Sequence, residues 1–246
     1  MEKMILFCFP YVGGSSTVYN KWKAFVDNCI ELVPVEYSGR GKRIREHFYD
    51  NMSEAIDDMY KTVSSFIEGR RFAVYGHSMG SVIAYEICKR IKMESGKDPL
   101  HIFVSGRYPP HVKKDEELLH MLPDDRFKEE ILKIGGTPGE VFENREFAQI
   151  FIPILRADYR LIERYEYVEE NVRFNCGITV LNGNADKITS GCDMFEWQKH
   201  TAHKIVISEF NGGHFFIHDY IKEITGIINS TLTECTLREN VVQINT

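Results

Sequence analysis

The stretch Arg71-Phe72-Ala73-Val74-Tyr75-Gly76-His77-Ser78-Met79-Gly80 decides how this chain folds. An apolar run typical of a β-strand ends at Gly76, and a helical pattern begins directly after Ser78. Glycine on either side of the serine lets a strand and a helix pass close together at a sharp turn. The G-x-S-x-G pattern in this context predicts that Ser78 is a nucleophile held at the tip of the turn.

Two backbone amides are candidates for an oxyanion hole. The helix after Ser78 begins with free N–H groups, so the Met79 amide is the expected first donor to a negatively charged oxygen. The second donor is expected in the turn Phe9-Pro10-Tyr11-Val12-Gly13-Gly14. Val12 is the predicted donor and Tyr11 the adjacent alternative. Taken alone, this turn is more typical of an ordinary strand-to-helix loop.

Strand and helix patterns alternate along the chain. The β-type runs are Met4 to Pro10, Ile30 to Tyr37, Arg71 to Gly76, His101 to Gly106, Gly177 to Gly183 and Lys204 to Phe210. Helical patterns lie between most of them, for example from Met52 to Ile67 and from Val82 to Ile91, where Gly96 closes the helix. This alternation predicts one α/β domain over residues 1–246, with a mostly parallel central sheet flanked by helices.

Residues 109–172 interrupt the alternation, because they contain no convincing strand pattern. Helical stretches are expected from Asp115 to Met121, from Asp124 to Ile134 and from Asn144 to Tyr167. We interpret the segment as a helical lid inserted in the domain over the active site. The alternative is a helical excursion that only packs on the sheet.

The partners of the serine should follow it in the order acid, then histidine, each at the end of a strand. Asp186 comes directly after an apolar strand and is the predicted acid, with Asp193 as the fallback. His214 follows the last strand and a flexible glycine pair, so it is the predicted base. His218 and His77 are weaker candidates, since His77 must point away from the serine.

Composition excludes several classes of function. The 246 residues carry a formal net charge of −6, which argues against nucleic acid as a partner. The six cysteines lack C-x-x-C spacing, which indicates reduced thiols and neither a disulfide framework nor a metal site. The sequence has no signal-peptide pattern and no apolar run of membrane length. A cytoplasmic monomer without a membrane partner is the expected form.

Blocks spread over residues 5 to about 216 together resemble a known family, the type II (external, editing) thioesterases of nonribosomal peptide and polyketide synthesis, within the α/β-hydrolase superfamily. The blocks are Phe9 to Gly14, Gly39 to Arg43, Gly76 to Gly80 with Ala84 to Glu86, Ser105 to Arg107, Gly135 to Pro138, Pro153 to Asp158 and Gly212 to Phe216. Many hydrolases share the Ser78 turn, but its combination with Leu-Arg-Ala-Asp and Gly-Gly-Thr-Pro is specific. One departure is Ser38, where the family usually has proline.

The resemblance implies an α/β-hydrolase fold and a defined chemistry. Ser78 would be acylated by a thioester carried on a phosphopantetheine arm, and water would then release the acid. His214 would act as the base, Asp186 as the orienting acid, and the Met79 and Val12 amides as the oxyanion hole. The implied role is to clear stalled or wrongly primed acyl groups from carrier domains. The phosphopantetheine belongs to the partner, so the chain itself needs no cofactor.

Arg40, Lys42, Arg43 and Arg45 form the densest basic stretch in an otherwise acidic chain. An acidic carrier domain could be steered to such a surface, so Arg40 and Arg43, together with Tyr11, are candidates for binding the carrier and its substrate. The favoured alternative is a solvated helix start with an arginine paired internally, because charge runs usually serve solubility.

Three other activities fit parts of the pattern. A general carboxylesterase or lipase-like hydrolase would use the same three side chains, and so would an acyltransferase that passes the acyl group to another acceptor. A non-catalytic module that binds carriers would keep the fold, but the intact Ser78, Asp186 and His214 set weighs against it.

Overall fold

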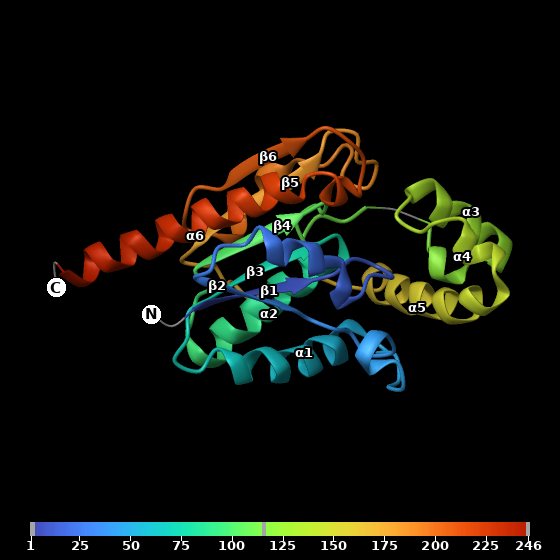
Figure 1. Ribbon diagram of the computed structural model, residues 1–246, viewed down its shortest axis with the longest axis horizontal. Coiled ribbons are helices and arrows are strands. Elements are labelled where there is room, and N and C mark those ends of the chain that lie inside the picture. Colours follow the sequence, from blue (N-terminus) through green and yellow to red (C-terminus); the bar gives the residue numbers. More distant parts are fainter. Residues whose placement is uncertain (1–2, 115–116, 245–246) are drawn as a thin grey trace.

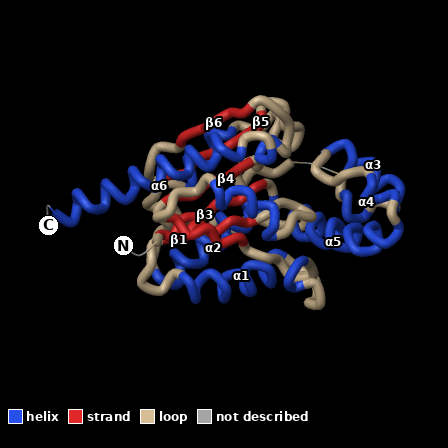
Figure 2. The backbone as a smooth tube through the Cα atoms, viewed as in Figure 1, coloured by secondary structure: helices blue, strands red, loops and turns tan. Residues whose placement is uncertain are grey.

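A six-stranded parallel sheet forms the centre of the protein (Figures 1 and 2). The computed structural model describes residues 3–114 and 117–244. The strands are β1 (Met4–Phe9), β2 (Ile30–Pro34), β3 (Phe72–His77), β4 (His101–Ser105), β5 (Gly177–Gly183) and β6 (Val206–Phe210). They lie in the order β2-β1-β3-β4-β5-β6, and every pairing between them is parallel. The predicted α/β fold with a mostly parallel sheet is therefore confirmed.

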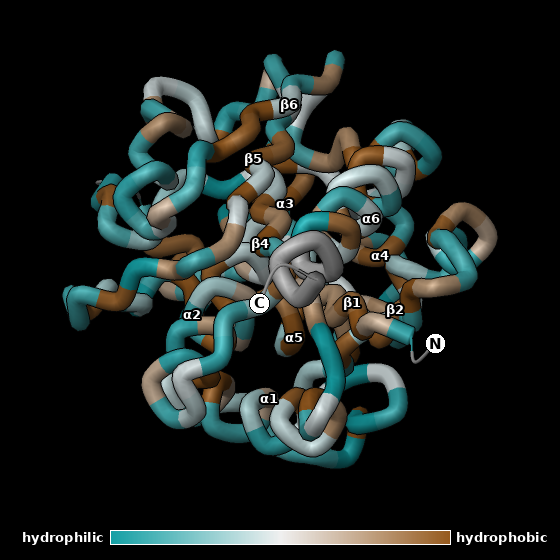
Figure 3. The backbone as a smooth tube through the Cα atoms, turned by 90° about the vertical axis from the view of Figure 1, so that its left-hand side faces the viewer, coloured by the Kyte–Doolittle hydropathy of each residue, from teal (hydrophilic) through white to brown (hydrophobic). Residues whose placement is uncertain are grey.

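Both faces of the sheet are covered, as parallel sheets require. Helices α1 (Met52–Phe66) and α2 (Met79–Ser95) cover one face, and α6 (Ile221–Ile244) with the 3-10 segment η1 (Ser16–Ala24) covers the other (Figures 1 and 3). Strand β1 shows how the residues divide: Ile5, Phe7 and Phe9 join the first core, while Met4, Leu6 and Cys8 join the second. This alternation follows from the two-residue period of a strand.

The segment between β4 and β5 is helical, as expected, and contains no strand in its described part. Its helices are α3 (Asp124–Ile134), α4 (Glu140–Glu143) and α5 (Arg145–Glu163). They form a group beyond one end of the sheet (Figure 1) and have a small core of their own, made by Phe127, Ile131 and Leu155. We call residues 109–172 the helical insertion.

The first helix predicted in the insertion is wrong in its described part. Residues 115–116 lie outside the described residues, and from there only the 3-10 turn η3 (Leu119–Met121) forms. Leu118 and Leu122 on either side have extended backbone, and Pro123 follows directly, so a longer helix has no room.

The remaining short elements are the 3-10 turns η2 (Gly41–Arg43), η4 (Met194–His200) and η5 (Phe216–His218). In the described ranges, no helix combines the length and apolarity needed to cross a lipid bilayer.

Candidate active site

Ser78 occupies the sharp turn that joins β3 to α2. Its φ of 56° and ψ of −118° are unusual for a residue with a side chain. The turn is held by the Ser78 N–H, which donates to the Ser105 carbonyl at 2.8 Å, and by the Ser81 N–H, which donates to the Ser78 carbonyl at 3.0 Å. The strained backbone is the feature expected of a nucleophile elbow.

The glycines of the turn are required by close backbone contacts. A Cβ atom at Gly80 would lie 2.1 Å from the Phe9 carbonyl oxygen, and one at Gly76 would lie 2.1 Å from the Gly80 carbonyl oxygen. Backbone atoms cannot swing aside as the end of a side chain can. The two glycines of the G-x-S-x-G pattern are therefore required for β1, β3 and α2 to pack this closely.

Asp186 and His214 lie side by side, although 28 residues separate them in the sequence. His214 Nδ1 is 2.8 Å from Asp186 Oδ2, and both residues are buried. The other carboxylate oxygen of Asp186 accepts the Ile188 N–H at 2.9 Å. The carboxylate is thus fixed by its own loop, and it fixes the orientation of the imidazole.

The weaker candidates have other partners. Asp193 caps η4 by accepting the Phe195 N–H at 2.8 Å, and His218 is hydrogen-bonded to the Tyr11 hydroxyl at 3.1 Å. His77 is hydrogen-bonded to the Ser105 hydroxyl at 2.9 Å, and its ring lies 4.9 Å from the His214 ring. Burial, and secondly the proximity of His214, hold the pKa of His77 well below its ordinary value. His77 is therefore neutral, and its ring packs against the ring of His214.

A cavity of about 500 Å³ opens onto the serine. Ser78, His214, Tyr11 and Val12 line it from the sheet side. The helical insertion contributes apolar side chains, among them Ile131, Ile134, Leu155 and Ile162, and also charged side chains such as Lys113, Glu117, Glu130 and Glu163. The structure therefore brings the predicted nucleophile and base to one space, with an apolar region beside them. Among the described residues, no group of histidine, cysteine or acidic side chains is arranged to hold a metal ion.

Of the two predicted oxyanion donors, Val12 lines this cavity and Met79 directly follows Ser78, which also lines it. Met79 is the first residue of α2, so its N–H has no partner within the helix. In the turn after β1, the Gly13 N–H donates to Asp158 Oδ2 at 2.8 Å and the Gly14 N–H donates to the Tyr11 carbonyl at 2.9 Å. These two amides already have acceptors, so the Val12 amide, with the adjacent Tyr11 amide as the alternative, remains the candidate donor in this turn.

Tyr11 lies between the site and the helical insertion. Its ring packs edge-on against Phe215 at 5.0 Å, and burial raises the pKa of its hydroxyl to about 12. The insertion reaches the same place through Gly136, where a Cβ atom would lie 2.2 Å from the Phe215 ring. Phe215 directly follows His214, so the insertion contacts the loop that carries the predicted base.

Arg40 is buried, which contradicts its prediction as a carrier contact. Only 4% of the residue is exposed, and its guanidinium forms an ion pair with the buried Asp158. Sequence reasoning placed both residues in blocks of the family pattern but did not pair them. Their separation of 118 residues leaves no local signal that they meet.

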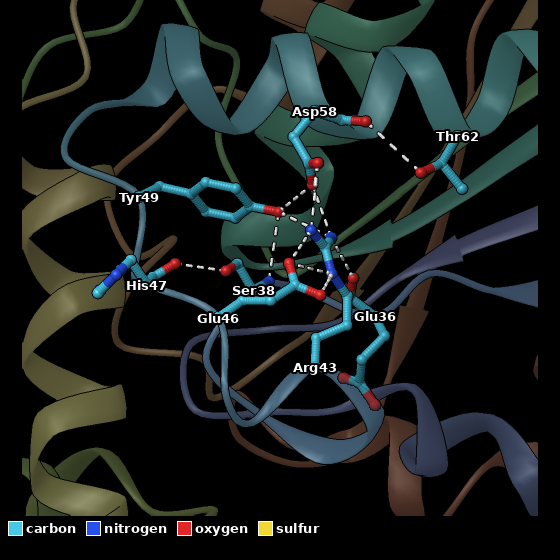
Figure 4. Close-up of polar contacts among 8 residues, drawn as sticks. All are labelled: Glu36, Ser38, Arg43, Glu46, His47, Tyr49, Asp58 and Thr62. Atoms are coloured by element: carbon cyan, nitrogen blue, oxygen red, sulfur yellow. Dashed lines mark hydrogen bonds and ion pairs between the residues drawn. The ribbon is translucent and has the colours of Figure 1, made fainter.

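Arg43 is also engaged within the chain, as the favoured alternative anticipates (Figure 4). It donates to Asp58 at 2.6 Å and to Glu46 at 2.9 Å, beside the Tyr49 hydroxyl. Ser38, which replaces the usual proline, is part of the same network. Its hydroxyl donates to the His47 carbonyl and its N–H donates to the Tyr49 hydroxyl at 3.3 Å. A proline could make neither contact.

The parallel sheet, the strained serine and the His214–Asp186 pair define an α/β-hydrolase-type enzyme. A family model that describes the thioesterase domain matches residues 4–232. The chain belongs to the thioesterase family, and it is a hydrolase of thioesters.

Three similar proteins support this placement. "Linear gramicidin dehydrogenase LgrE" of Brevibacillus parabrevis is 35% identical over 233 residues, which cover 94% of this chain and 88% of LgrE. The crystal structure of ClbQ from the colibactin NRPS/PKS pathway is 35% identical with a TM-score of 0.91, covering 96% of this chain and 99% of ClbQ.

The third is the type II thioesterase BorB from the borrelidin biosynthetic cluster, which is 28% identical with a TM-score of 0.85, covering 94% of this chain and 93% of BorB. LgrE is named as a dehydrogenase, whereas BorB is named as a type II thioesterase and the matching family model describes a thioesterase domain. The predicted resemblance to type II thioesterases is confirmed.

Proposed function

We propose that this protein hydrolyses acyl thioesters on the phosphopantetheine arm of carrier domains, through an acyl-enzyme on Ser78. The observation that carries the mechanism is the shared cavity, which the strained Ser78 and the Asp186-bound His214 enter together. We also propose that residues 1–246 act as one domain and that the helical insertion is its lid.

In the acylation step, Ser78 Oγ attacks the thioester carbonyl carbon while His214 Nε2 accepts the serine proton. Asp186 holds Nδ1–H, which keeps the imidazole in the required tautomer and stabilises its charged form. The Val12 and Met79 amides donate to the oxyanion. The C–S bond then breaks, the arm leaves as a thiolate, and the proton on His214 passes to it. The product of this step is an ester on Ser78 and a free thiol.

In the deacylation step, a water molecule replaces the thiol. His214 accepts a proton from the water as its oxygen attacks the ester carbonyl, and the same two amides hold the oxyanion. Collapse of this intermediate releases the carboxylic acid and returns the proton to Ser78 Oγ. The net reaction consumes one water and one thioester. Thioesters suit the site because a thiolate leaves readily and needs little help from the acid.

The lining of the cavity includes side chains that suit each of the two parts of this substrate. The apolar side chains of the insertion offer an acyl group an environment that excludes water. Arg107, Lys113 and Lys187 also line the cavity, and their positive charges suit a phosphorylated arm. The insertion would have to move or the arm would have to thread past it, which is why we assign it the role of a lid.

The partners proposed here follow from the relatives. ClbQ comes from an NRPS/PKS pathway and BorB from a biosynthetic cluster, so carrier domains of such synthases are the proposed partners. The described cysteines form no disulfide bond, which suits the cytoplasm, where we propose the protein works. With Arg40 and Arg43 engaged internally, Lys42 and Arg45 are the residues of the basic stretch that remain exposed toward a carrier.

The test is the intact mass of carrier proteins loaded with different acyl groups, before and after exposure to the enzyme. The wild type is expected to return them to the free-thiol form, and Ser78→Ala is expected to lose this activity by about 10⁴-fold or more. Ser65→Ala, at an exposed serine of α1, is the matched control and should act as the wild type.

Three outcomes would contradict the proposal. Equal discharge by wild type and Ser78→Ala would remove the acyl-enzyme. Faster cleavage of a matched oxygen ester than of the thioester would indicate a general esterase. Transfer of the acyl group to an added alcohol or amine in place of water would indicate an acyltransferase.

A further inference from the structure

We propose that the buried pair Arg40–Asp158 positions the oxyanion turn, so that the Val12 amide is correctly placed only when helix α5 of the insertion is docked. Neither side chain touches the reacting atoms, so both are positioning residues. The inference rests on the proposed acyl-enzyme mechanism, in which Val12 donates to the oxyanion.

The contacts of the pair converge on the two residues after Val12. Arg40 Nη1 and Nη2 donate to Asp158 Oδ2 and Oδ1 at 2.6 and 2.5 Å. Asp158 Oδ2 also accepts the Gly13 N–H at 2.8 Å, and Arg40 Nη1 also donates to the Gly14 carbonyl at 3.0 Å. One ion pair therefore holds a donor and an acceptor of the same turn.

Geometry transmits this hold to Val12. The Gly14 N–H donates to the Tyr11 carbonyl at 2.9 Å, and this carbonyl shares one rigid peptide plane with the Val12 N–H, so holding Gly13 and Gly14 in place also orients the Val12 amide. Gly13 has a φ of 76°, and a Cβ atom there would lie 2.5 Å from the Leu155 side chain of α5. On the opposite side, the Tyr37 hydroxyl donates to the Pro10 carbonyl at 2.8 Å. The turn is thus clamped between the loop after β2 and the insertion.

Stability alone does not explain a charged pair in this place. The side chains of Arg40 and Asp158 are 4% and 2% exposed. The free energy lost when both charges are removed from water offsets much of the free energy gained from their attraction. Apolar residues of similar volume often serve a core at least as well. What apolar residues cannot do is accept the Gly13 N–H and donate to the Gly14 carbonyl in fixed directions.

The pair also joins two separate parts of the chain. Asp158 belongs to α5, whereas Arg40 lies in the loop between β2 and η2. If α5 moves away, the Gly13 amide loses its acceptor and Arg40 loses its counter-charge. The geometry therefore couples the position of the insertion to the oxyanion hole.

The variants Asp158→Asn and Arg40→Lys test this role. Asparagine keeps the size of the side chain but removes the charge that holds Arg40. Lysine keeps the charge but cannot form the bidentate contact with the Asp158 carboxylate. With a short, freely soluble acyl thioester as substrate, kcat is expected to fall about 10- to 100-fold and KM to stay within about 2-fold, because an oxyanion donor acts in the transition state.

A second readout separates positioning from general damage. An alkyl boronic acid forms a tetrahedral adduct on a serine and so uses the oxyanion hole, whereas a non-cleavable thioether analogue of the substrate does not. In both variants the boronate should bind more weakly by a factor that matches the loss in kcat/KM. Binding of the thioether should change by less than about 2-fold.

Lys92→Met is the matched control, since it removes the partly buried pair between Lys92 and Asp98 far from the turn. It should lower the thermal unfolding midpoint and leave kcat unchanged. Folded Asp158→Asn or Arg40→Lys with wild-type kcat and boronate affinity would overturn the inference. So would losses that affect boronate and thioether equally. A fully active Ser78→Ala would instead overturn the acyl-enzyme mechanism, so the two failures are distinguishable.

Discussion

At the scale of single residues, the proposed chemistry depends on how Asp186 holds His214. One carboxylate oxygen is 2.8 Å from His214 Nδ1, and the other accepts the Ile188 N–H at 2.9 Å. Both oxygens therefore have a fixed partner, and the imidazole has one preferred orientation. In the proposed mechanism this leaves His214 Nε2 as the nitrogen that accepts the proton of Ser78.

Replacing the acid should remove this control. Asp186→Asn keeps the shape of the side chain but favours the wrong imidazole tautomer, so kcat is expected to fall by about 10⁴-fold in steady-state assays at neutral pH. Asp193→Asn is the matched control, because Asp193 only caps η4. A large loss in the control with little loss in Asp186→Asn would assign the acid to Asp193.

Single residues were the easiest part of the site to predict from the sequence. Ser78 lies in a pattern with three fixed positions. Asp186 and His214 each follow a predicted strand, which is where this fold places its acid and its histidine. The contacts of Asp158 could not be predicted, since its partners Arg40 and Gly13 lie 118 and 145 residues away. No local pattern reports a contact of that range.

At the scale of elements, the junction of β1, β3 and α2 leaves no space for side chains. Gly80→Ala would place a methyl group 2.1 Å from where the Phe9 carbonyl oxygen lies, so strand and helix must separate. We expect the free energy of unfolding to fall by about 3 kcal/mol or more, at the upper end of overpacking effects. Chemical denaturation measures it.

The control for this substitution is Gly226→Ala in the second turn of α6, where a Cβ atom would meet nothing within 4 Å. Alanine there should raise stability by up to about 1 kcal/mol, because glycine is a poor helix former. Equal effects at the two positions would show that the crowding at Gly80 can relax without cost.

Helices and strands could be predicted where the hydrophobic pattern continued over enough residues. All six strands and helices α1, α2 and α3 coincide with the predicted patterns to within a few residues. The predicted helix that ends at Met121 fails in its described part because a short stretch beside Pro123 carries little information on its own. The basic stretch from Arg40 to Arg45 was ambiguous for a different reason: charge alone does not tell whether an arginine faces solvent or a carboxylate.

At the scale of the whole molecule, buried histidines should make the fold sensitive to acid. His101 is 6% exposed, its Nε2 lies 2.8 Å from the Thr179 hydroxyl, and burial lowers its pKa to about 4. Burial likewise lowers the pKa of His200 to about 3. Both side chains are neutral in the folded protein under conditions in which the unfolded chain is protonated.

The sign of the effect follows from these shifts. Below the unfolded pKa of about 6.5 the unfolded state binds more protons, so stability is full above that pH and falls as the pH drops toward 4. Between pH 7.5 and 5.5, His101 alone should cost about 1.3 kcal/mol of unfolding free energy. Urea titrations give the free energy of unfolding at each pH. The loss of this free energy between pH 7.5 and 5.5 should be smaller in His101→Gln than in the wild type by this amount.

His47→Gln, at an exposed histidine, is the control and should keep the pH dependence of the wild type. An unchanged pH dependence in His101→Gln would mean that the His101 side chain has the same pKa in the folded and the unfolded protein, which would contradict the prediction.

The position of the helical insertion has a consequence for how such proteins can diversify. The insertion leaves the sheet after β4 and returns before β5, and these two strands are direct neighbours. An insertion of another length or shape could in principle replace it without changing the order of the strands, so the acyl pocket could evolve separately from the reacting groups. Asp158 limits this freedom. A replacement without an acid at that point would leave the buried Arg40 charge unbalanced, so each exchanged insertion has to bring this one carboxylate with it.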